Sequence, residues 1–563
     1  MTALVVLALM CVGVSNQVQA ATYYVATTGN DTASGTSAAP WRTVAYAVDR
    51  MVAGDTTYVK GGVYNETRAA RFKRSGTSSA PIRLMNAPGE SPVIDYASAT
   101  DYMRRIYISN ATGQTSENRD PTGWIVIEGF EIRNGPAGIT LYNTHDTIIR
   151  RNWIHHTQSQ GISGIGKNIL IDRNIINYAG GRCINGYAEF LSPPRSCNQV
   201  HAMYLTGSNF TITNNLLYDN LAVGIHVAGY PWCTDGTCYG GGSKDKYDPS
   251  YAGAANWLIA NNMIAYNRHA CGIELWQPGT VNSRIINNIL YENSQNGSGP
   301  QGICFTSPGG GHVFQNNLFY ATAPGATASI ETGYQTKYTE SGSIVNVSPP
   351  NFVDAPATIA LAGSADFHLQ SGSPAINQGL NLYSLGVTKD FSGAARPQTG
   401  AFEIGAYEYG SAPAPVAFNF SLSNGGSKSV TQSASVTNSL TATLVSGTAQ
   451  AVSLSVSGLP SGVTASFSPA SCTPNCSSTL TLSASASAAA GTATVTVTAA
   501  GGGISRTSAF TLTVNATTPP PPPPPATGPV GWWKLDENTG LSAADFSGNG
   551  NNGTLVNGPT WTT

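Results

Sequence analysis

Apolar and polar positions alternate in two short phrases that recur through the N-terminal part of the chain. One phrase is an apolar strand that ends in an asparagine, at Asn152, Asn174, Asn215, Asn262, Asn288 and Asn317. The other is a small residue followed by an apolar strand position, and it begins at Gly138, Gly161, Ala202, Gly224, Gly272 and Gly302. Recurrence of one unit at a period of roughly 20 to 50 residues is typical of a solenoid. We therefore predict an all-β region whose parallel strands coil around a common core.

The recurring asparagine is predicted to serve the turn between two strands of each coil. Asparagine tolerates the left-handed conformation that a tight turn requires. Its side-chain amide is also suited to bond with the asparagine of the next coil. We therefore expect an asparagine ladder along the solenoid.

Strand geometry separates inward from outward positions in the second phrase. The residue after the small one is apolar and is expected to face the core, so the residue after that faces outward. This outward column consists of Thr140, Ser163, Tyr204, His226, Glu274 and Cys304. Since neighbouring coils lie ~4.8 Å apart, Tyr204, His226 and Glu274 are predicted to lie side by side. His201 and Trp276 flank them in sequence and are candidate substrate-binding residues.

Two long insertions interrupt the repeat on either side of Tyr204 and His226. They span roughly residues 179–200 and 228–255, and each contains a close cysteine pair, Cys183/Cys197 and Cys233/Cys238. Long loops on a rigid scaffold commonly form binding clefts. The second loop also holds aromatic, basic and acidic residues suited to sugars, which are Trp232, Tyr247, Lys244, Lys246, Asp235, Asp245 and Asp248. The alternative interpretation is that the aromatic residues only anchor the loop.

Several N-terminal segments resemble those of a known family. They are Trp41-Arg42-Thr43, Gly54-Asp55-Thr56, Gly61-Gly62-Val63-Tyr64 and Pro81-Ile82-Arg83-Leu84. Together with the repeat, they resemble right-handed parallel β-helix proteins of the pectate-lyase type, especially polysaccharide lyase family nine. The resemblance covers roughly residues 22–410 and implies the fold more than the chemistry, because lyases, hydrolases, epimerases and non-catalytic adhesins share it. A helical stretch at Val44–Met51 is expected to cap the first coil.

The remaining segments suggest further units. The apolar run at residues 4–14, followed by Val18-Gln19-Ala20, predicts a signal peptide over residues 1–20 and secretion to the cell exterior or surface. The β-helix domain is then expected at 21–410. Residues 411–516 alternate Ser, Thr, Val and Ala with period two and resemble a bacterial immunoglobulin-like β-sandwich, a candidate spacer.

A polyproline linker at 517–527 leads to the last segment of the chain. Residues 528–563 resemble the first strands of a laminin-G or concanavalin-like jelly roll. That segment is expected to be truncated and poorly ordered, because so few residues bury little core.

Composition narrows the possible partners. Charged residues make up 10% of the chain and the formal net charge is −2, so neither nucleic acid nor an anionic membrane is indicated. The apolar run near the N-terminus is too short to span a membrane. We expect a monomer that acts on a polysaccharide.

Cysteine spacing favours local disulfides in an exported protein. Cys472 and Cys476 are a third close pair. Cys271 and Cys304 lie on neighbouring coils at different places in the repeat, so a bond between them is not expected.

The column of Tyr204, His226 and Glu274 suggests β-elimination on a uronate-containing polysaccharide. That reaction needs a base, an acid and a cation that neutralises the substrate carboxylate. His226 is the candidate base, Glu274 its orienting partner and Tyr204 the acid or a second base. Candidate neutralising cations are Arg182, Arg268, Lys244 and Lys246.

Two other functions stay open at this point. Glycoside hydrolysis would pair Glu274 with Glu189, Asp245 or Asp248. A glycan-binding or cell-surface protein without catalysis is the third class, because a polar column must face outward in any solenoid. The family-nine resemblance implies a lysine base beside a calcium site of several aspartates. The coils carry no such cluster, which leaves Asp235, Asp245 and Asp248 as the candidate calcium ligands.

Overall fold

The computed structural model describes the backbone of most of the chain. The described residues are 20–97, 105–109, 121–181, 183–184, 187–188, 196–229, 233–234, 237–238, 253–294, 301–322, 329–355, 365–398, 400–410, 418–446, 449–517 and 528–562. The predicted signal peptide lies outside them, apart from its last residue. No helix in these ranges is long and apolar enough to cross a membrane.

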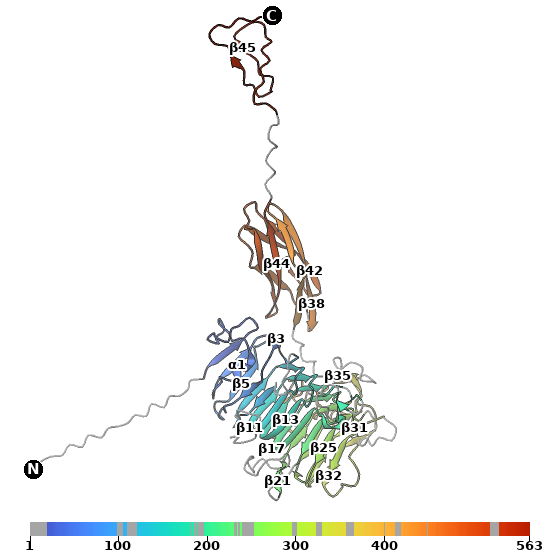
Figure 1. The fold of residues 1–563 in the computed structure, drawn as a ribbon. Coiled ribbons are helices and arrows are strands. Elements are labelled where there is room, and N and C mark those ends of the chain that lie inside the picture. The colour runs from blue at the N-terminus through green and yellow to red at the C-terminus, as the bar shows by residue number, and fades with distance from the viewer. Residues whose placement is uncertain are drawn as a thin grey trace, which may run out of the picture.

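Between β1 and β33, parallel strands stack coil upon coil and form three columns along the solenoid (Figure 1), while β15–β16 and β20–β21 form two separate antiparallel pairs. The first column holds the Gly-Ile phrases. It comprises β4 (Ala70–Phe72), β7 (Ile106–Ile108), the first parts of β11 (Ile139–Arg150), β13 (Ile162–Asp172) and β17 (Met203–Thr213), then β19 (Ile225–Ala228), β25 (Ile273–Trp276) and β29 (Ile303–Thr306).

The second column uses the last parts of the three long strands. It comprises β1 (Thr22–Val25), β2 (Thr56–Val59), β5 (Ile82–Asn86), β9 (Ile125–Glu128), the ends of β11, β13 and β17, then β23 (Leu258–Ala260), β27 (Arg284–Ile286), β30 (His312–Gln315) and β32 (Tyr338–Ser341). Short strands β8 (Thr122–Gly123), β22 (Ala254–Ala255) and β26 (Thr280–Val281) pair between these two columns.

The third column forms a separate ten-stranded parallel sheet. Its strands are β3 (Gly62–Asn65), β6 (Pro92–Asp95), β10 (Glu131–Arg133), β12 (Trp153–His155), β14 (Ile175–Asn177), β18 (Leu216–Tyr218), β24 (Met263–Ala265), β28 (Ile289–Tyr291), β31 (Leu318–Tyr320) and β33 (Ile344–Val345).

The core is a set of stacked apolar side chains, one from each coil. At the predicted inward position of the first column, Ile139, Ile162, Met203, Ile225, Ile273 and Ile303 are all fully buried. Burying each such side chain contributes about 1.5–3 kcal/mol. The period-two reading of the sequence therefore assigned the two faces of these strands correctly.

The predicted asparagine ladder is present between the second and third columns. The backbone N–H and the side-chain amide of Asn152 both donate to Asn174 Oδ1, at 3.1 Å each, and Asn174 repeats the pattern with Asn215. The ladder continues through Asn262 and Asn288 to Asn317. All of these side chains are buried, and the polar groups of each turn find their hydrogen-bond partners on the next coil.

The predicted place of the left-handed residue was wrong by one position. Positive φ belongs to the residue before each ladder asparagine, which is Arg151, Arg173, Asn214, Asn261, Asn287 or Asn316. The ladder asparagines themselves keep ordinary φ, because their amides must point along the solenoid axis to reach the next coil.

The N-terminal helix α1 (Val44–Val48) buries Val44, Ala45, Ala47 and Val48. Thr43 caps it by accepting a bond from the Tyr46 N–H. The buried Glu66 accepts from the Val44 N–H at 2.6 Å. Burial raises the pKa of Glu66 to about 7 despite the two backbone N–H groups that bond to it.

Residues 378–408, which we name the C-terminal strap, return along the solenoid and bond to the left-handed asparagines. Asn316 donates to Gln378 O, Asn287 exchanges two bonds with Leu380, and Asn261 donates to Glu403 O and Gly405 O. The buried Arg396 donates to Asn214 Oδ1 and pairs with the buried Glu408 at 2.5 Å. The strap also includes the short 3-10 helix η4 (Tyr383–Leu385). The antiparallel pair β34 (Phe352–Asp354) and β35 (Asp366–Leu369) precedes the strap in sequence.

Two antiparallel-rich sheets follow between residues 418 and 517. One contains β36 (Asn419–Asn424), β38 (Ser435–Ser446), β40 (Val463–Ser468) and β42 (Cys476–Ala484). The other contains β37 (Lys428–Thr431), β39 (Val452–Ser457), β41 (Ser471–Cys472), β43 (Gly491–Gly501) and β44 (Ile504–Asn515). Residues 528–562 hold only β45 (Ser542–Ala543) and β46 (Gly553–Thr554), with Trp532 and Trp533 exposed.

Two disulfides are present among the cysteines whose side chains the structure describes, while the predicted pairs Cys183/Cys197 and Cys233/Cys238 include side chains outside that description. Cys472 and Cys476 are bonded, as their spacing predicted. The expectation that Cys271 and Cys304 do not pair was wrong, because the turn before β25 brings Cys271 within a Cα–Cα distance of 6.0 Å of Cys304. Short strands β15 (Cys183–Ile184), β16 (Tyr187–Ala188), β20 (Cys233–Thr234) and β21 (Thr237–Cys238) and the 3-10 turn η1 (Cys197–Gln199) lie in the two insertions.

Candidate functional site

Three chemically different side chains lie on adjacent coils of the first column. Tyr204 of β17 pairs in register with His226 of β19, and His226 pairs with Glu274 of β25. Each follows a buried apolar residue, so the strand pleat turns it outward. The structure therefore brings together the residues that the repeat aligned, and we name them the first-column stripe.

The imidazole of His226 is the centre of this stripe. Its Nδ1 lies 2.9 Å from Glu274 Oε2, at ion-pair distance but outside hydrogen-bond alignment. Both ring nitrogens are buried and have no hydrogen-bond partner among the described residues. A buried polar atom left without a partner is unfavourable, and such atoms are frequent at functional sites.

Aromatic rings surround the imidazole. The Tyr204 ring stacks on it with centroids 4.6 Å apart, and the rings of His201 and Trp276 lie at 4.6 and 5.5 Å. Tyr204 and Trp276 are partly exposed, so their rings are the ones that a sugar at this position would meet. Stacking of aromatic faces on apolar sugar faces suits this arrangement.

Glu274 is held as an anion. Burial raises its pKa, but His226 and the Thr306 hydroxyl outweigh burial, so the pKa lies below its usual value. The Thr306 hydroxyl donates to Glu274 Oε1 at 3.1 Å. A carboxylate facing Nδ1 favours the proton on that nitrogen and leaves the lone pair on Nε2.

His201 lies beneath the stripe and is buried. Its Nδ1 accepts a bond from the Val223 N–H at 3.3 Å. Burial first, and the neighbouring His226 second, lower its pKa well below the ordinary value. The ring is therefore uncharged at neutral pH and supports the packing of Tyr204, against which it stacks.

Arg268 does not join the stripe through any contact in the described ranges. Its Nε donates to Asp219 Oδ1 at 2.8 Å, and its guanidinium lies over the Tyr178 ring. It is thus engaged on the turn between the third and first columns. That leaves three other candidate cations for a substrate carboxylate, Arg182, Lys244 and Lys246.

Those three cations and the remaining loop residues of the prediction lie outside the described residues. They are Arg182, Trp232, Lys244, Lys246, Tyr247, Asp235, Asp245 and Asp248. Across the described ranges, no group of three or more His, Cys, Asp or Glu residues is suited to hold a metal ion. Because the candidate calcium ligands Asp235, Asp245 and Asp248 lie outside the described residues, calcium binding stays a prediction, and we derive no step through it.

Sequence reasoning missed one neighbour of Glu274, Thr306, which reaches it from the next coil. Cys304 lies at the next outward position of the column, as predicted, but its disulfide to Cys271 was not expected. The strand register could have indicated Thr306. This residue pairs with Trp276, which lies two residues beyond Glu274 on the same face of β25.

Comparisons with known proteins agree with this architecture. A family model described as "Pel9A-like, right handed beta helix region" matches residues 23–180. A second, described as "Right handed beta helix region", matches residues 118–345. Together with the parallel columns, they confirm the predicted right-handed parallel β-helix.

Curated relatives match only part of the chain. Over 141 residues, this chain is 35% identical to "Pectate lyase PEL9" of Emericella nidulans. The matched segment covers 24% of this chain and 34% of that protein. Over 71 residues it is 39% identical to "Uncharacterized protein YwoF" of Bacillus subtilis, covering 13% and 15% respectively. The chain thus spans about a third of the length of the first relative and less of the second. A solved structure titled "Rhamnogalacturonan lyase" aligns at 17% identity with a TM-score of 0.39, covering 59% of this chain and 90% of that one.

Taken together, the family models and the curated relative support a pectate-lyase-like β-helix of the polysaccharide-lyase type. The Pel9A-like model ends at residue 180, before the first-column stripe, and the general β-helix model covers the stripe. The chemistry of that stripe rests on its own geometry.

Proposed function

We propose that the protein is a secreted polysaccharide lyase that cleaves a uronate-containing polysaccharide by β-elimination. The observation that carries this proposal is the first-column stripe, where His226 Nδ1 lies 2.9 Å from Glu274 Oε2 and Tyr204 stacks on the same imidazole. The likeness of the N-terminal coils to a pectate lyase supports the same reaction class.

In the proposed reaction, His226 Nε2 takes the proton from the sugar carbon beside the carboxylate. The electron pair of that C–H bond forms a carbon–carbon double bond, and the glycosidic bond to the neighbouring ring carbon breaks. The Tyr204 hydroxyl gives a proton to the leaving oxygen. General acid and base groups of this kind typically contribute about 10²- to 10⁴-fold each.

Glu274 acts as the positioning residue of the base. Because its pKa is lowered, it stays ionised at neutral pH and stabilises the imidazolium that forms when His226 accepts the proton. The substrate carboxylate needs a cation, for which Arg182, Lys244 and Lys246 are the candidates. Trp276 and Tyr204 supply ring surface for the sugar.

The other segments complete the proposal. The two-sheet unit at 418–517 is assigned as an immunoglobulin-like spacer, and residues 528–563 as part of a laminin-G or concanavalin-like unit. The protein acts as a monomer outside the cell or at its surface, and its partner is the polysaccharide.

Incubation with different glycans tests the reaction class. Pectate, alginate, glycosaminoglycans and neutral glycans are each supplied to the full chain. New ultraviolet absorbance from an unsaturated sugar on an acidic glycan is the expected result. Reducing ends without that absorbance would mean hydrolysis, and binding without either product would mean a non-catalytic glycan-binding protein.

A further inference from the structure

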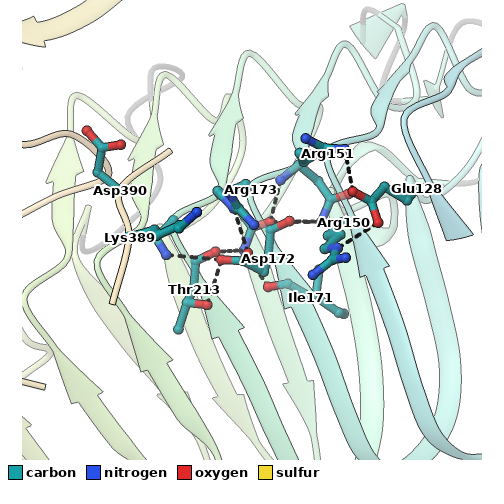
Figure 2. A network of polar contacts seen from close by, with 12 residues as sticks. Glu128, Arg150, Arg151, Ile171, Asp172, Arg173, Thr213, Lys389 and Asp390 are labelled. Atoms are coloured by element: carbon teal, nitrogen blue, oxygen red, sulfur yellow. Dashed lines mark hydrogen bonds and ion pairs between the residues drawn. The ribbon is translucent and has the colours of Figure 1, made fainter. Parts of the chain in front are cut away.

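A polar groove lies on the second column, away from the first-column stripe. The outward ends of its strands present Glu128, Arg150, Asp172 and Thr213 in register on consecutive coils. The Leu385–Lys389 part of the C-terminal strap runs beside them and closes a groove of about 600 Å³ (Figure 2). That volume lies within the range of about 300–1,000 Å³ typical of ligand sites.

The acidic side chains of the groove are covered and already paired. Glu128, which is 4% exposed, accepts from Arg150 Nε at 2.8 Å and is also paired with Arg151. Asp172 accepts from Arg173 Nε at 2.7 Å, and from Thr213 and Asn214 at 3.0 Å each. The negative charges of Glu128 and Asp172 are offset by their arginine partners, so they repel an incoming anion only weakly.

The basic side chains keep donors for a ligand. Arg150 and Arg173 each use Nε in their pairs, which leaves the Nη side of both guanidinium groups. The side chains of Arg150 and Arg151 are 32% and 52% exposed. Lys389, on the opposite rim, is exposed and takes part in no ion pair within the described ranges. Among the residues that line the groove, Arg150, Arg173 and Lys389 are basic and Asp172 is acidic, which leaves an excess of positive charge.

The turns of the solenoid place two of these arginines at unusual positions. Arg151 and Arg173 occupy the left-handed position that Asn214, Asn261, Asn287 and Asn316 occupy in the following coils. The left-handed conformation is less favourable for arginine than for asparagine. Where the position is asparagine, the C-terminal strap bonds to it. Arg173 lines the groove, whereas Arg151 pairs with Glu128. Residues kept in such conformations cluster at functional sites.

We propose that this groove is a non-catalytic subsite for an acidic saccharide, with Arg150, Arg173 and Lys389 binding a uronate carboxylate. Arginine guanidinium matches a carboxylate in a two-point fashion. Amides of Asn168 and Asn209, together with the apolar Leu170 and Val387, line the same groove and suit the hydroxyls and ring faces of a sugar. The ligand class rests on the proposed function, whereas the site rests on the groove itself.

The subsite lies on a different column from the first-column stripe. It would hold a distant part of the same polysaccharide chain, or a second chain, and so raise affinity without taking part in bond cleavage. Its charge makes the binding sensitive to salt.

Calorimetric titration of the full chain tests the subsite. The probes are oligogalacturonate, oligoguluronate and a neutral malto-oligosaccharide of equal length, and the protein carries His226→Ala so that no probe is cleaved. The variants are Arg150→Gln and Lys389→Gln in that background. Arg284→Gln is the matched control, because Arg284 is an exposed arginine on β27 of the same column, outside the groove.

We expect at least one acidic oligomer to bind more tightly than the neutral one. Arg150→Gln should weaken that binding about tenfold, Lys389→Gln about threefold, and Arg284→Gln not at all. Both groove variants should also flatten the dependence of affinity on salt.

Equal binding of acidic and neutral oligomers would overturn the subsite, as would unchanged affinity in both groove variants. Thermal melting identifies any folding defect of Arg150→Gln. If that variant unfolds, Lys389→Gln still tests the subsite, because Lys389 is exposed. The two proposals fail separately. If acidic oligomers bind but no unsaturated product forms, the proposed lyase activity is wrong and the subsite stands. If unsaturated product forms but Arg150→Gln and Lys389→Gln bind as tightly as the parent protein, the subsite is wrong and the lyase activity stands.

Discussion

The asparagine ladder and the first-column stripe run along the same solenoid, yet one repeats a single residue and the other changes at every coil. Each inner ladder member, from Asn174 to Asn288, donates to the next asparagine and accepts from the one before, so the same residue type serves both roles. The stripe places a phenol, an imidazole and a carboxylate in succession, flanked by Ser163 and Cys304. Uniform columns hold the coils together, and a column that varies is where chemistry is found.

The ladder and the stripe also differ in how many of their buried polar atoms are hydrogen-bonded. The ladder amides are buried and bonded on both sides, whereas His226 is buried with both ring nitrogens unbonded. Substitutions in the ladder should therefore reduce stability, and substitutions in the stripe should reduce activity.

The largest expected effect is on the reaction rate of His226→Ala. Loss of the base should lower the rate of unsaturated-sugar formation by about 10²- to 10⁴-fold. The melting temperature should fall as well, because the change leaves the mostly buried Glu274 without its ion-pair partner and opens a cavity among the surrounding rings, so the rates are compared at a temperature where both proteins are folded. Ser163→Ala, two coils away on the same column, is the control and should keep full activity. A His226→Ala protein with wild-type rate would contradict the site.

The next effect is on stability, in Asn262→Ala. This change removes bonds to Asn288 Oδ1, Ile212 O and Ala260 O, and leaves the N–H of Asn215 without its acceptor. We expect the free energy of unfolding to fall by about 2–4 kcal/mol. Denaturant unfolding measures it. Asn65→Ala, at an exposed asparagine of β3 without positive φ, should cost less than about 1 kcal/mol, and equal losses at both positions would mean that burial does not matter.

A pH effect is expected in the strap that covers the ladder side. Burial, followed by the neighbouring Glu408, raises the pKa of Glu403 to about 9. The folded protein therefore binds a proton that the unfolded chain releases near pH 4.3. This group should make stability fall between about pH 4.5 and 9, by no more than about 1.4 kcal/mol per pH unit. Thermal melting of Glu403→Gln should show a flatter pH dependence over this window than the wild type. Parallel curves for both proteins would contradict the assignment.

The smallest effect is expected in Thr306→Val. Its hydroxyl helps to lower the pKa of Glu274, so its loss should raise that pKa. With a higher pKa, Glu274 would take up its proton at a higher pH than in the wild type. The acid limb of the pH–activity profile should therefore shift to higher pH. The rate near neutral pH should fall only a few-fold. An unchanged acid limb would show that Thr306 does not act through Glu274.

The periodic parts of this structure could be predicted from the sequence, and the parts formed by long-range return of the chain could not. The inward and outward faces of β17, β19 and β25 follow from the period-two pattern, and their register follows from the aligned glycines. The left-handed residue was placed one position late, because both residues of an Asn-Asn turn are equally plausible in sequence.

The strap and the groove were missed for a different reason. Arg396 reaches Asn214 across 182 residues and Leu380 reaches Asn287 across 93, and no local pattern marks such contacts. The pairing of Cys271 with Cys304 escaped the register argument because Cys271 lies in a turn, outside the strand alignment. Of the groove arginines, Arg173 was visible in sequence only as an exception, at a position that is asparagine in the later coils.

A double-mutant cycle on the initial rate of unsaturated-sugar formation tests the central claim most directly. Wild type, His226→Ala, Glu274→Gln and the double variant are compared on the same acidic polysaccharide. Because the carboxylate acts only through the imidazole, the double variant should be no slower than His226→Ala alone. Losses that multiply, or a Glu274→Gln protein as fast as the wild type, would contradict a working pair on the outside of the solenoid.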